Sequence, residues 1–461
     1  MSSCGCSRRS FLRLAALGAT AGLATPALAA PALAGPSSLA DVPRLRPGGP
    51  ALVGGLRVLA GSLHDHSTDS DGDAPSATIA AYIRAHAREL GLDFFSLTEH
   101  SDFFPESLGG ADPWARSLSV CDHYSGDGFA FLRGFEWTND QQNHLNVLGS
   151  AGWLRRDESF TMTPFWRWLS TAPGPYAGGL APSLGGSDGV GQFNHPASKG
   201  PLNWDDYTYD AAAAQRMATI EVRGKAAGWY WFALSRGWRV GPVMNADFHP
   251  WQASGLLANP RPGAGTDGAG FYPGERSLVI ARDASRGALL NALRARRTAA
   301  TDRPDLWGTL RTESGQWMGS RVAAAPGSTL RLVVDAGTAA SRIASVSLVQ
   351  DVPFSSTVAQ HFYGDNPVES WDNQHAAAYA EQHRRYLLSG GKATFKGELD
   401  TPPRGATIRT VDWPTGARTA RLRWSVPRTR SPRPDGAHWV YAVVRRADGA
   451  KVTTAPLLVQ A

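Results

Sequence analysis

About seven short apolar runs divide residues 56–305, and nearly every one leads into a histidine or an acidic residue. The runs predict buried strands, and a stretch with helical spacing, formed by Ile79, Tyr82, Ile83 and Leu90, lies between two of them. Strands that alternate with helices predict a parallel α/β sheet, and about seven of them predict a barrel-like domain. Because the reactive residues of such barrels lie at the C-terminal ends of many strands, the pattern predicts one site assembled from distant residues.

The first candidate ligands are His64 and His66, which end the apolar run that begins at residue 56. Residues two apart on a strand project to the same side, so both imidazoles can reach one cation. Such a pair alone is more often two surface histidines. A metal site is favoured by the motifs further along the chain, which are Thr98-Glu99-His100, Gly134-Phe135-Glu136, His144, Asn194-His195-Pro196 and Asn245-Ala246-Asp247-Phe248-His249.

Taken together, these motifs resemble the PHP (polymerase and histidinol phosphatase) family of metal-dependent hydrolases over residues 56–305. The resemblance implies a distorted (β/α)7 barrel. The layout includes the segment Leu290–Thr301 and a β-rich C-terminal part, and it looks most like the carbaryl-hydrolase-like CehA/McbA branch of that family.

The resemblance also implies a ligand set for two or three divalent metal ions. His64, His66, Glu136 and Asp247 would hold the first ion, Glu136 would bridge to a second ion completed by His144 and His195, and Asp71, His100 and His249 would hold a third. Imidazoles and carboxylates together suit Mn²⁺, Zn²⁺ or Fe, and the lack of a thiolate among them argues against a structural zinc-finger site. Neighbouring metals that share a bridging hydroxide need no protein nucleophile. The expected catalytic residues are therefore Glu136 as the shared ligand and Asp247 or His249 as the proton carrier.

The reaction is less constrained than the metal site. Arg223 and Lys225 follow the apolar run 219–222, where a barrel presents its site, and could bind a phosphate, although salt bridges on loops explain them equally well. Aromatic residues near the motif loops, such as Phe103 and Trp137, could line a pocket for an aryl leaving group, although a core role is the simpler interpretation. We expect a phosphoesterase acting on a small-molecule phosphoester. A carbamate or carboxylic ester hydrolase is the alternative reaction, and a non-catalytic metal- or anion-binding module is the alternative of another class.

Residues 1–34 resemble a twin-arginine signal peptide. Adjacent arginines within residues 7–13 precede a mildly apolar stretch, and Ala-Leu-Ala sequences at 27–29 and 32–34 offer cleavage sites. The resemblance implies the twin-arginine export machinery as a partner and an extracellular or cell-envelope location. Glycine and proline interrupt the apolar stretch, so we expect no stable membrane anchor. After cleavage Cys121 is the only cysteine, which excludes an internal disulfide.

The rest of the chain predicts supporting parts. Residues 35–55 are rich in Pro, Gly and Ala and predict a linker. Residues 306–461 contain alternating apolar runs separated by turns, which predict a smaller β-rich, sandwich-like domain, with one helix over 374–388. The formal net charge of +6 includes three arginines of the leader, and no dense basic run is interleaved with aromatics, so no nucleic-acid partner is expected. A solvated or hydrogen-bonded role is expected for the histidines outside the motifs, which are His86, His123, His361, His375, His383 and His438.

Overall fold

The structure is a computed structural model, and it describes residues 50–72, 74–104, 112–139, 142–156, 161–174, 183–196, 203–223, 227–249, 274–351, 362–363, 366–367, 406–431 and 433–460. These residues belong to one compact unit, Ser38–Ala461. The predicted signal peptide and most of the predicted linker lie outside the described residues, as do Lys225 and the helix expected over 374–388.

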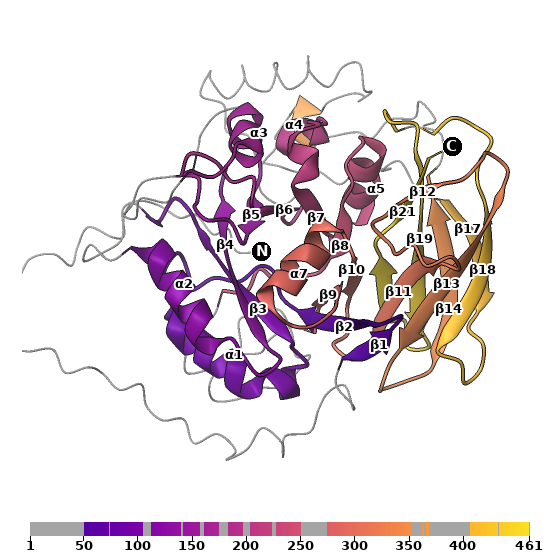
Figure 1. Ribbon diagram of the computed structural model, residues 1–461, viewed down its shortest axis with the longest axis horizontal. Coiled ribbons are helices and arrows are strands. Elements are labelled where there is room, and N and C mark those ends of the chain that lie inside the picture. The colour runs from indigo at the N-terminus through magenta and orange to yellow at the C-terminus, as the bar shows by residue number, and fades with distance from the viewer. Residues whose placement is uncertain are drawn as a thin grey trace, which may run out of the picture. The chain divides into compact units, whose positions relative to one another are not determined.

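A large mixed sheet carries the candidate ligands (Figure 1). Its strands in this part of the chain are β1 (Ala51–Val53), β2 (Leu56–Gly61), β3 (Phe94–His100), β4 (Ala130–Trp137), β5 (Leu145–Leu148), β6 (Val190–Phe193), β7 (Met217–Glu221), β8 (Gly241–Val243), β9 (Arg276–Ala281) and β10 (Thr298–Thr301). They are ordered β10-β9-β2-β3-β4-β5-β6-β7-β8, with β1 paired to β2. The long apolar runs that predicted strands form β2, β3, β4, β6, β7, β8 and β9.

The sheet differs from the purely parallel one that the sequence predicts. The pairs β2–β3, β3–β4, β6–β7 and β7–β8 are parallel. Strand β5, however, is antiparallel to both β4 and β6, and β9 is antiparallel to both β2 and β10. The four residues of β5 are too few for periodicity to distinguish a strand from a loop. A hairpin therefore separates β4 from β6, which a simple β/α alternation does not anticipate.

Among the described strands, no backbone hydrogen-bonded pairing joins β8 to β10, so the expected barrel is not closed by strand pairing. The hydrogen-bonded path ends at β8, whose backbone approaches β10. A Cβ atom added at Gly241 would lie 2.2 Å from the hydroxyl oxygen of Thr298, so only glycine permits this approach.

Helices follow several of the strands. They are α1 (Ser76–Leu90), α2 (Pro113–Tyr124), α3 (Thr163–Ser170), α4 (Asn203–Tyr207), α5 (Ala227–Ser235) and α7 (Arg286–Arg294), with a short 3₁₀ turn at Ala213–Gln215. The helical spacing of Ile79, Ile83 and Leu90 is confirmed, because these side chains form the buried face of α1. The helix ends at Gly91, whose φ of 66° gives the left-handed cap that glycine favours. Helices α1 and α2 pack against each other (Figure 1).

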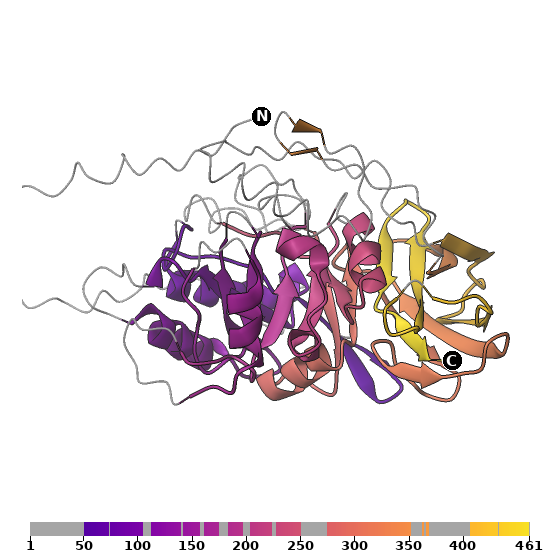
Figure 2. The ribbon, with the colours of Figure 1, turned by 90° about the horizontal axis from the view of Figure 1, so that it is seen from above.

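The remaining strands form the predicted β-rich part. They are β11 (Trp307–Thr312), β12 (Arg321–Ala323), β13 (Thr329–Gly337), β14 (Ile343–Gln350), β15 (Phe362–Tyr363), β16 (Asn366–Pro367), β17 (Ala406–Asp412), β18 (Thr419–Ser425), β19 (His438–Arg446), β20 (Lys451–Thr454) and β21 (Leu457–Gln460). Strands β11, β13 and β18 make a separate sheet. Strands β14 and β19 pair in antiparallel fashion, and β20 continues the large sheet by pairing with β10. The orange and yellow strands of this part lie together in Figure 2. The boundary at residue 306 stays a prediction.

Candidate metal centre

The sheet brings the candidate ligands to one edge. Strands β2, β3, β4, β6 and β8 supply residues at or just beyond their C-terminal ends, namely His64, His66, His100, Glu136, His195, Asp247 and His249. His144 instead precedes β5. Because β5 is antiparallel to β4, its N-terminal end lies at the C-terminal end of β4, and the hairpin adds His144 to the same edge.

Four buried atoms converge at the centre of this edge without a hydrogen bond. His64, His66, Glu136 and Asp247 each offer one ligand atom, and these atoms all lie within 4.8 Å of one another. The Nε2 atoms of His64 and His66 both lie 3.2 Å from Oδ1 of Asp247. Among the described residues these three atoms, and Oε2 of Glu136, have no hydrogen-bond partner. A buried polar atom without a partner is costly, so this group fits a bound cation.

Glu136 is the shared member of the centre. Its carboxylate oxygens lie 3.0 to 3.4 Å from imidazole nitrogens of five histidines, His64, His66, His100, His144 and His195. A second candidate group joins Glu136 to His144 and His100, while His195 Nε2 lies 3.3 Å from the same carboxylate. The structure thus brings together the residues expected to hold a second ion, with His100 close enough to contribute there as well.

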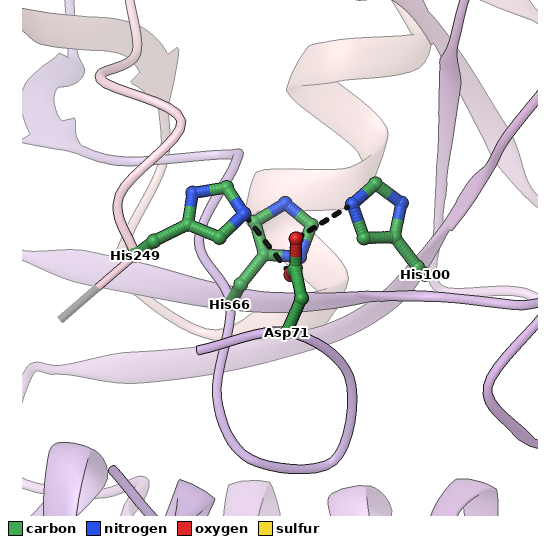
Figure 3. A group of neighbouring side chains, drawn as sticks. All are labelled: His66, Asp71, His100 and His249. Atoms are coloured by element: carbon green, nitrogen blue, oxygen red, sulfur yellow. Dashed lines mark ion pairs between the residues drawn. The ribbon is translucent and has the colours of Figure 1, made fainter. Parts of the chain in front are cut away.

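A third group surrounds Asp71 (Figure 3). Its carboxylate lies 3.0 Å from Nε2 of His249 and 3.5 Å from Nε2 of His100. The ring of His66 stacks on that of His249, with centroids 4.3 Å apart, and its Nδ1 lies 3.7 Å from Asp71. His66 therefore stands between the first and third groups, so the nine predicted ligands form one continuous cluster.

The carboxylates set the protonation of the metal-free cluster. Burial disfavours a charged His64, but Glu136, Asp247 and Glu221 outweigh it and raise the pKa of that imidazole well above its usual 6.5. The pKa of His100 is also raised, against burial, by Glu136 and Asp71. His144 behaves in the opposite way, since burial dominates and lowers its pKa to about 4. The carboxylates thus favour the charged forms of His64 and His100, and a cation would compete with protons for these imidazoles.

The backbone is bent sharply where two ligands leave their strands. His195 has a φ of 29° and Asp247 a φ of 53°, in the left-handed region that non-glycine residues rarely adopt. Beside Asp247, the backbone N–H of His66 donates to the carbonyl of Phe248 at 2.9 Å. Such bends concentrate at functional sites, where surrounding contacts hold them in place.

Sequence reasoning missed several residues that support the cluster. Glu221, buried at the end of β7, lies 3.0 Å from Nδ1 of His64. Glu99 accepts hydrogen bonds from the backbone and hydroxyl of Ser67, at 2.9 and 2.6 Å, and so holds the loop that carries Asp71. Asn194 donates to Glu136 at 2.8 Å. The available signal was a polar side chain inside or beside each apolar run.

The proposed substrate-binding pair is only partly described. The guanidinium of Arg223 contacts Glu275 at 3.1 Å, which is the salt bridge expected of a loop arginine. It also donates to the carbonyl of Ala246, the residue that precedes Asp247, at 3.4 Å. Lys225 lies outside the described residues. Of the nearby aromatics, Trp137 is buried in the core, whereas Phe103 is 38% exposed and its ring lies 6.2 Å from that of His100.

The other described histidines stand apart from the cluster. His86 lies on α1, partly exposed, with Nδ1 3.1 Å from Glu89, and His123 is exposed on α2. His438 is buried and hydrogen-bonded to Asp351 at 2.8 Å. The expectation of solvated or hydrogen-bonded roles is confirmed for these three, and His361, His375 and His383 lie outside the described residues.

Comparison with known proteins gives few matches. No family model matches the chain, and no curated protein matches it. One solved structure to which it is similar is a two-domain protein containing a predicted PHP-like metal-dependent phosphoesterase from Bacteroides vulgatus ATCC 8482. The match has a TM-score of 0.39 and 15% sequence identity, and it covers 81% of this chain and 99% of that chain. Within the described ranges, no helix combines the length and apolar character needed to cross a membrane.

Proposed function

We propose that this protein is a metal-dependent hydrolase of PHP type that cleaves phosphoesters. The observation that carries the proposal is the convergence of His64, His66, Glu136 and Asp247, whose inward atoms have no hydrogen-bond partner among the described residues. Hydrogen bonds within the protein satisfy most buried polar groups, so four such atoms in one place fit a bound cation. Two imidazoles and two carboxylates are a donor set that divalent cations prefer.

The three overlapping groups support two or three divalent ions, of Mn, Zn or Fe. The lack of a cysteine in any of the groups favours these metals over a thiolate-bound structural zinc. Cations bound there would supply Lewis-acid activation of water and neutralise charge on the phosphoryl oxygens. Glu136 would hold adjacent ions together, since its two oxygens face different histidines.

Three residues of the chain are suited to carry the proton or to bind the substrate. The side chain of Asp247 is 29% exposed, against 0% for His64 and 1% for Glu136, so among these three its carboxylate is the one that can exchange a proton with substrate or solvent. The Nδ1–H of His249 donates to the carbonyl of Asp247 at 2.9 Å, which fixes the ring with Nε2 toward Asp71. Arg223 would bind the phosphate, because its planar guanidinium suits phosphate oxygens.

Hydrolysis of an aryl carbamate or carboxylic ester is the second candidate. The observation in its favour is Phe103, which is partly exposed beside His100 and offers an aromatic face to an apolar leaving group. We also propose export through the twin-arginine pathway, supported by the adjacent arginines and the small-residue cleavage sequences of residues 1–34. Replacing both Arg8 and Arg9 with lysine should retain the protein in the cytoplasm, as cell fractionation would measure.

The reaction is tested by a side-by-side hydrolysis assay of the Mn²⁺-loaded protein on an aryl phosphate and an aryl N-methylcarbamate. A chelated sample and the Asp351→Asn variant, altered far from the cluster in sequence and contacts, serve as controls. We expect metal-dependent turnover of the phosphate. Turnover of the carbamate alone would move the assignment to the second candidate, and metal binding without turnover of either would favour the non-catalytic binding module.

A further inference from the structure

Glu221 is a buried carboxylate with four nitrogen contacts. Its Oε2 accepts from the backbone N–H of His195 at 2.5 Å, and its Oε1 accepts from the side-chain amides of Asn245 at 2.9 Å and Gln192 at 3.4 Å. The fourth contact joins Oε1 to Nδ1 of His64 at 3.0 Å. Two of the four donors thus belong to residues of the predicted ligand set.

The contact with His64 fixes which ring nitrogen keeps a proton when the imidazole is neutral, as it must be to bind a cation. An ionised carboxylate only accepts hydrogen bonds, so the nitrogen that faces Glu221 must be the donor, Nδ1–H. The lone pair of Nε2 is then free for a cation, and Nε2 is the atom that points toward Glu136 and Asp247, at 3.1 and 3.2 Å. A carboxylate behind a metal-bound histidine fixes the ring's tautomer and orientation in this way.

The contact with His195 fixes a backbone bend. The residue has a φ of 29°, which is unfavourable for a side chain with a Cβ atom. The hydrogen bond from its N–H to Glu221 is short and partly buried, and it holds the chain where His195 turns its Nε2 toward Glu136. Without this bond the backbone is free to relax and to carry the imidazole away from the carboxylate.

We propose that Glu221 is a positioning residue that presents two metal ligands from one carboxylate, His64 through its ring and His195 through its backbone. The inference rests on the proposed metal centre and deepens it. His64 belongs to the expected first cation position and His195 to the second, so Glu221 couples the two positions without touching either ion. Substitution of this one residue should therefore weaken both.

The test is direct measurement of metal affinity in Glu221→Gln. Glutamine keeps the size of the side chain, but one of its terminal groups is an NH₂ donor. In either orientation it therefore meets an N–H of His195, Asn245 or Gln192, or the Nδ1–H of His64. We expect the affinity for Mn²⁺ and for Zn²⁺, measured by titration calorimetry, to fall about 10- to 100-fold, as for other carboxylates behind metal-bound histidines. The visible spectrum of the Co²⁺-loaded protein should change as well, because it reports ligand geometry.

The matched control is Asp351→Asn, which alters another buried carboxylate bonded to a histidine Nδ1, that of His438. It should leave the metal affinity and the Co²⁺ spectrum unchanged. If Glu221→Gln lowers the folded fraction by circular dichroism, Glu221→Asp replaces it. Aspartate keeps the charge but is one methylene too short for all four contacts, and it should give an intermediate loss of affinity.

The outcomes separate this inference from the proposed function. Wild-type affinity and spectrum in folded Glu221→Gln would overturn the positioning role, whatever the enzyme hydrolyses. Weakened binding in the variant, with a wild type that binds metal but cleaves no ester, would support the positioning role and overturn the phosphoesterase assignment. A wild type that binds neither Mn²⁺ nor Zn²⁺ would overturn both.

Discussion

The pairs His64–Glu221 and His438–Asp351 are both buried, and they lie in different parts of the sheet. They differ in what the Nε2 atom of the histidine contacts. In the ligand-bearing part, Nδ1 of His64 meets Glu221 at 3.0 Å, and Nε2 has no hydrogen-bond partner among the described residues. In the β-rich part, Nδ1 of His438 meets Asp351 at 2.8 Å, and Nε2 lies 3.0 Å from the carbonyl of Thr429. In the first pair, which we call the open pair, the Nε2 atom of the histidine has no hydrogen-bond partner among the described residues. In the second, which we call the closed pair, both ring nitrogens are hydrogen-bonded.

The difference separates a ligand from a structural histidine. Asp351 is also bonded by the hydroxyl of Ser431, which in turn bonds the carbonyl of Ala437, so that pair is a local network that joins loop residues. Around His64 the neighbouring groups are other imidazoles and carboxylates. A buried histidine bonded to a carboxylate through one ring nitrogen therefore indicates a metal site when its other ring nitrogen faces further possible metal ligands. It indicates a structural role when that nitrogen is hydrogen-bonded to a backbone carbonyl.

The largest effect on activity is expected from Glu136→Gln, because Glu136 faces Nε2 of His64 in the open pair. Glu136 contacts five histidines of the cluster, and its loss removes a charge that no other residue there replaces. Turnover of an aryl phosphate should fall by more than about 100-fold, beyond the loss typical of residues behind the ligands. Steady-state kinetics of the Mn²⁺-loaded variant measures it. Hydrolysis at the wild-type rate would contradict the shared-ligand role.

The pH dependence of metal binding gives the second prediction. In the metal-free protein nearby carboxylates raise the pKa of His64 and of His100 above the usual 6.5, so a cation must displace protons that are still bound above that pH. Mn²⁺ affinity should therefore rise with pH from about 6.5 upward. Calorimetry in two buffers of different ionisation enthalpy would measure the released protons. Affinity that is independent of pH would show that these imidazoles are neutral before binding.

The closed pair should affect stability alone. Asp351→Ala removes the acceptor of His438 and Ser431, both of which are buried. Leaving the buried Nδ1–H of His438 without an acceptor should lower the free energy of unfolding by about 1–3 kcal/mol. Urea denaturation measures this loss, and the Mn²⁺ affinity of the folded variant should equal that of the wild type. A variant that loses metal affinity would end the distinction between the two pairs.

The smallest effect is expected at Asp305, a carboxylate that precedes β11 and whose partners lie in the β-rich part. Burial raises the pKa of this carboxyl, but hydrogen bonds from Thr338 and two backbone N–H groups, together with Arg446, outweigh burial and lower it below 3.8. A lowered pKa means that the ionised form stabilises the fold above 3.8 and that this contribution is lost as the pH falls through the lower folded value. Asp305→Asn should cost about 1 kcal/mol at neutral pH, in urea denaturation, and less in acid. A loss of unfolding free energy that is larger in acid than at neutral pH would show that the pKa of Asp305 is raised in the folded protein, not lowered.

The sequence predicted the parts of the fold that depend on local pattern. Long apolar runs became strands, α1 buried the residues of its helical period, and His64, Glu136 and Asp247 met because each follows such a run. The alternating runs after residue 306 became β13, β14, β18 and β19 for the same reason. In each case the hydrophobic period is fixed by the residues themselves.

The features that were missed depend on distant partners. Strand β5 is four residues long and gains its pairing from β4 and β6 rather than from its own pattern. Glu221 resembles a chance acid in an apolar strand until His64, 157 residues away, is placed beside it. Tertiary contacts, which no single run reveals, decide both.

The hairpin of β4 and β5 also gives the centre one local contact beside its long-range ones. Glu136 and His144 are 8 residues apart and face each other across that hairpin, whereas His64 meets Glu221 only after a 157-residue stretch of chain has closed. The entropy lost on closing a loop grows with its length, and local contacts form sooner. We therefore expect Glu136 and His144 to meet earlier in folding than His64 and Glu221, and a cation present during folding would find these two side chains together first.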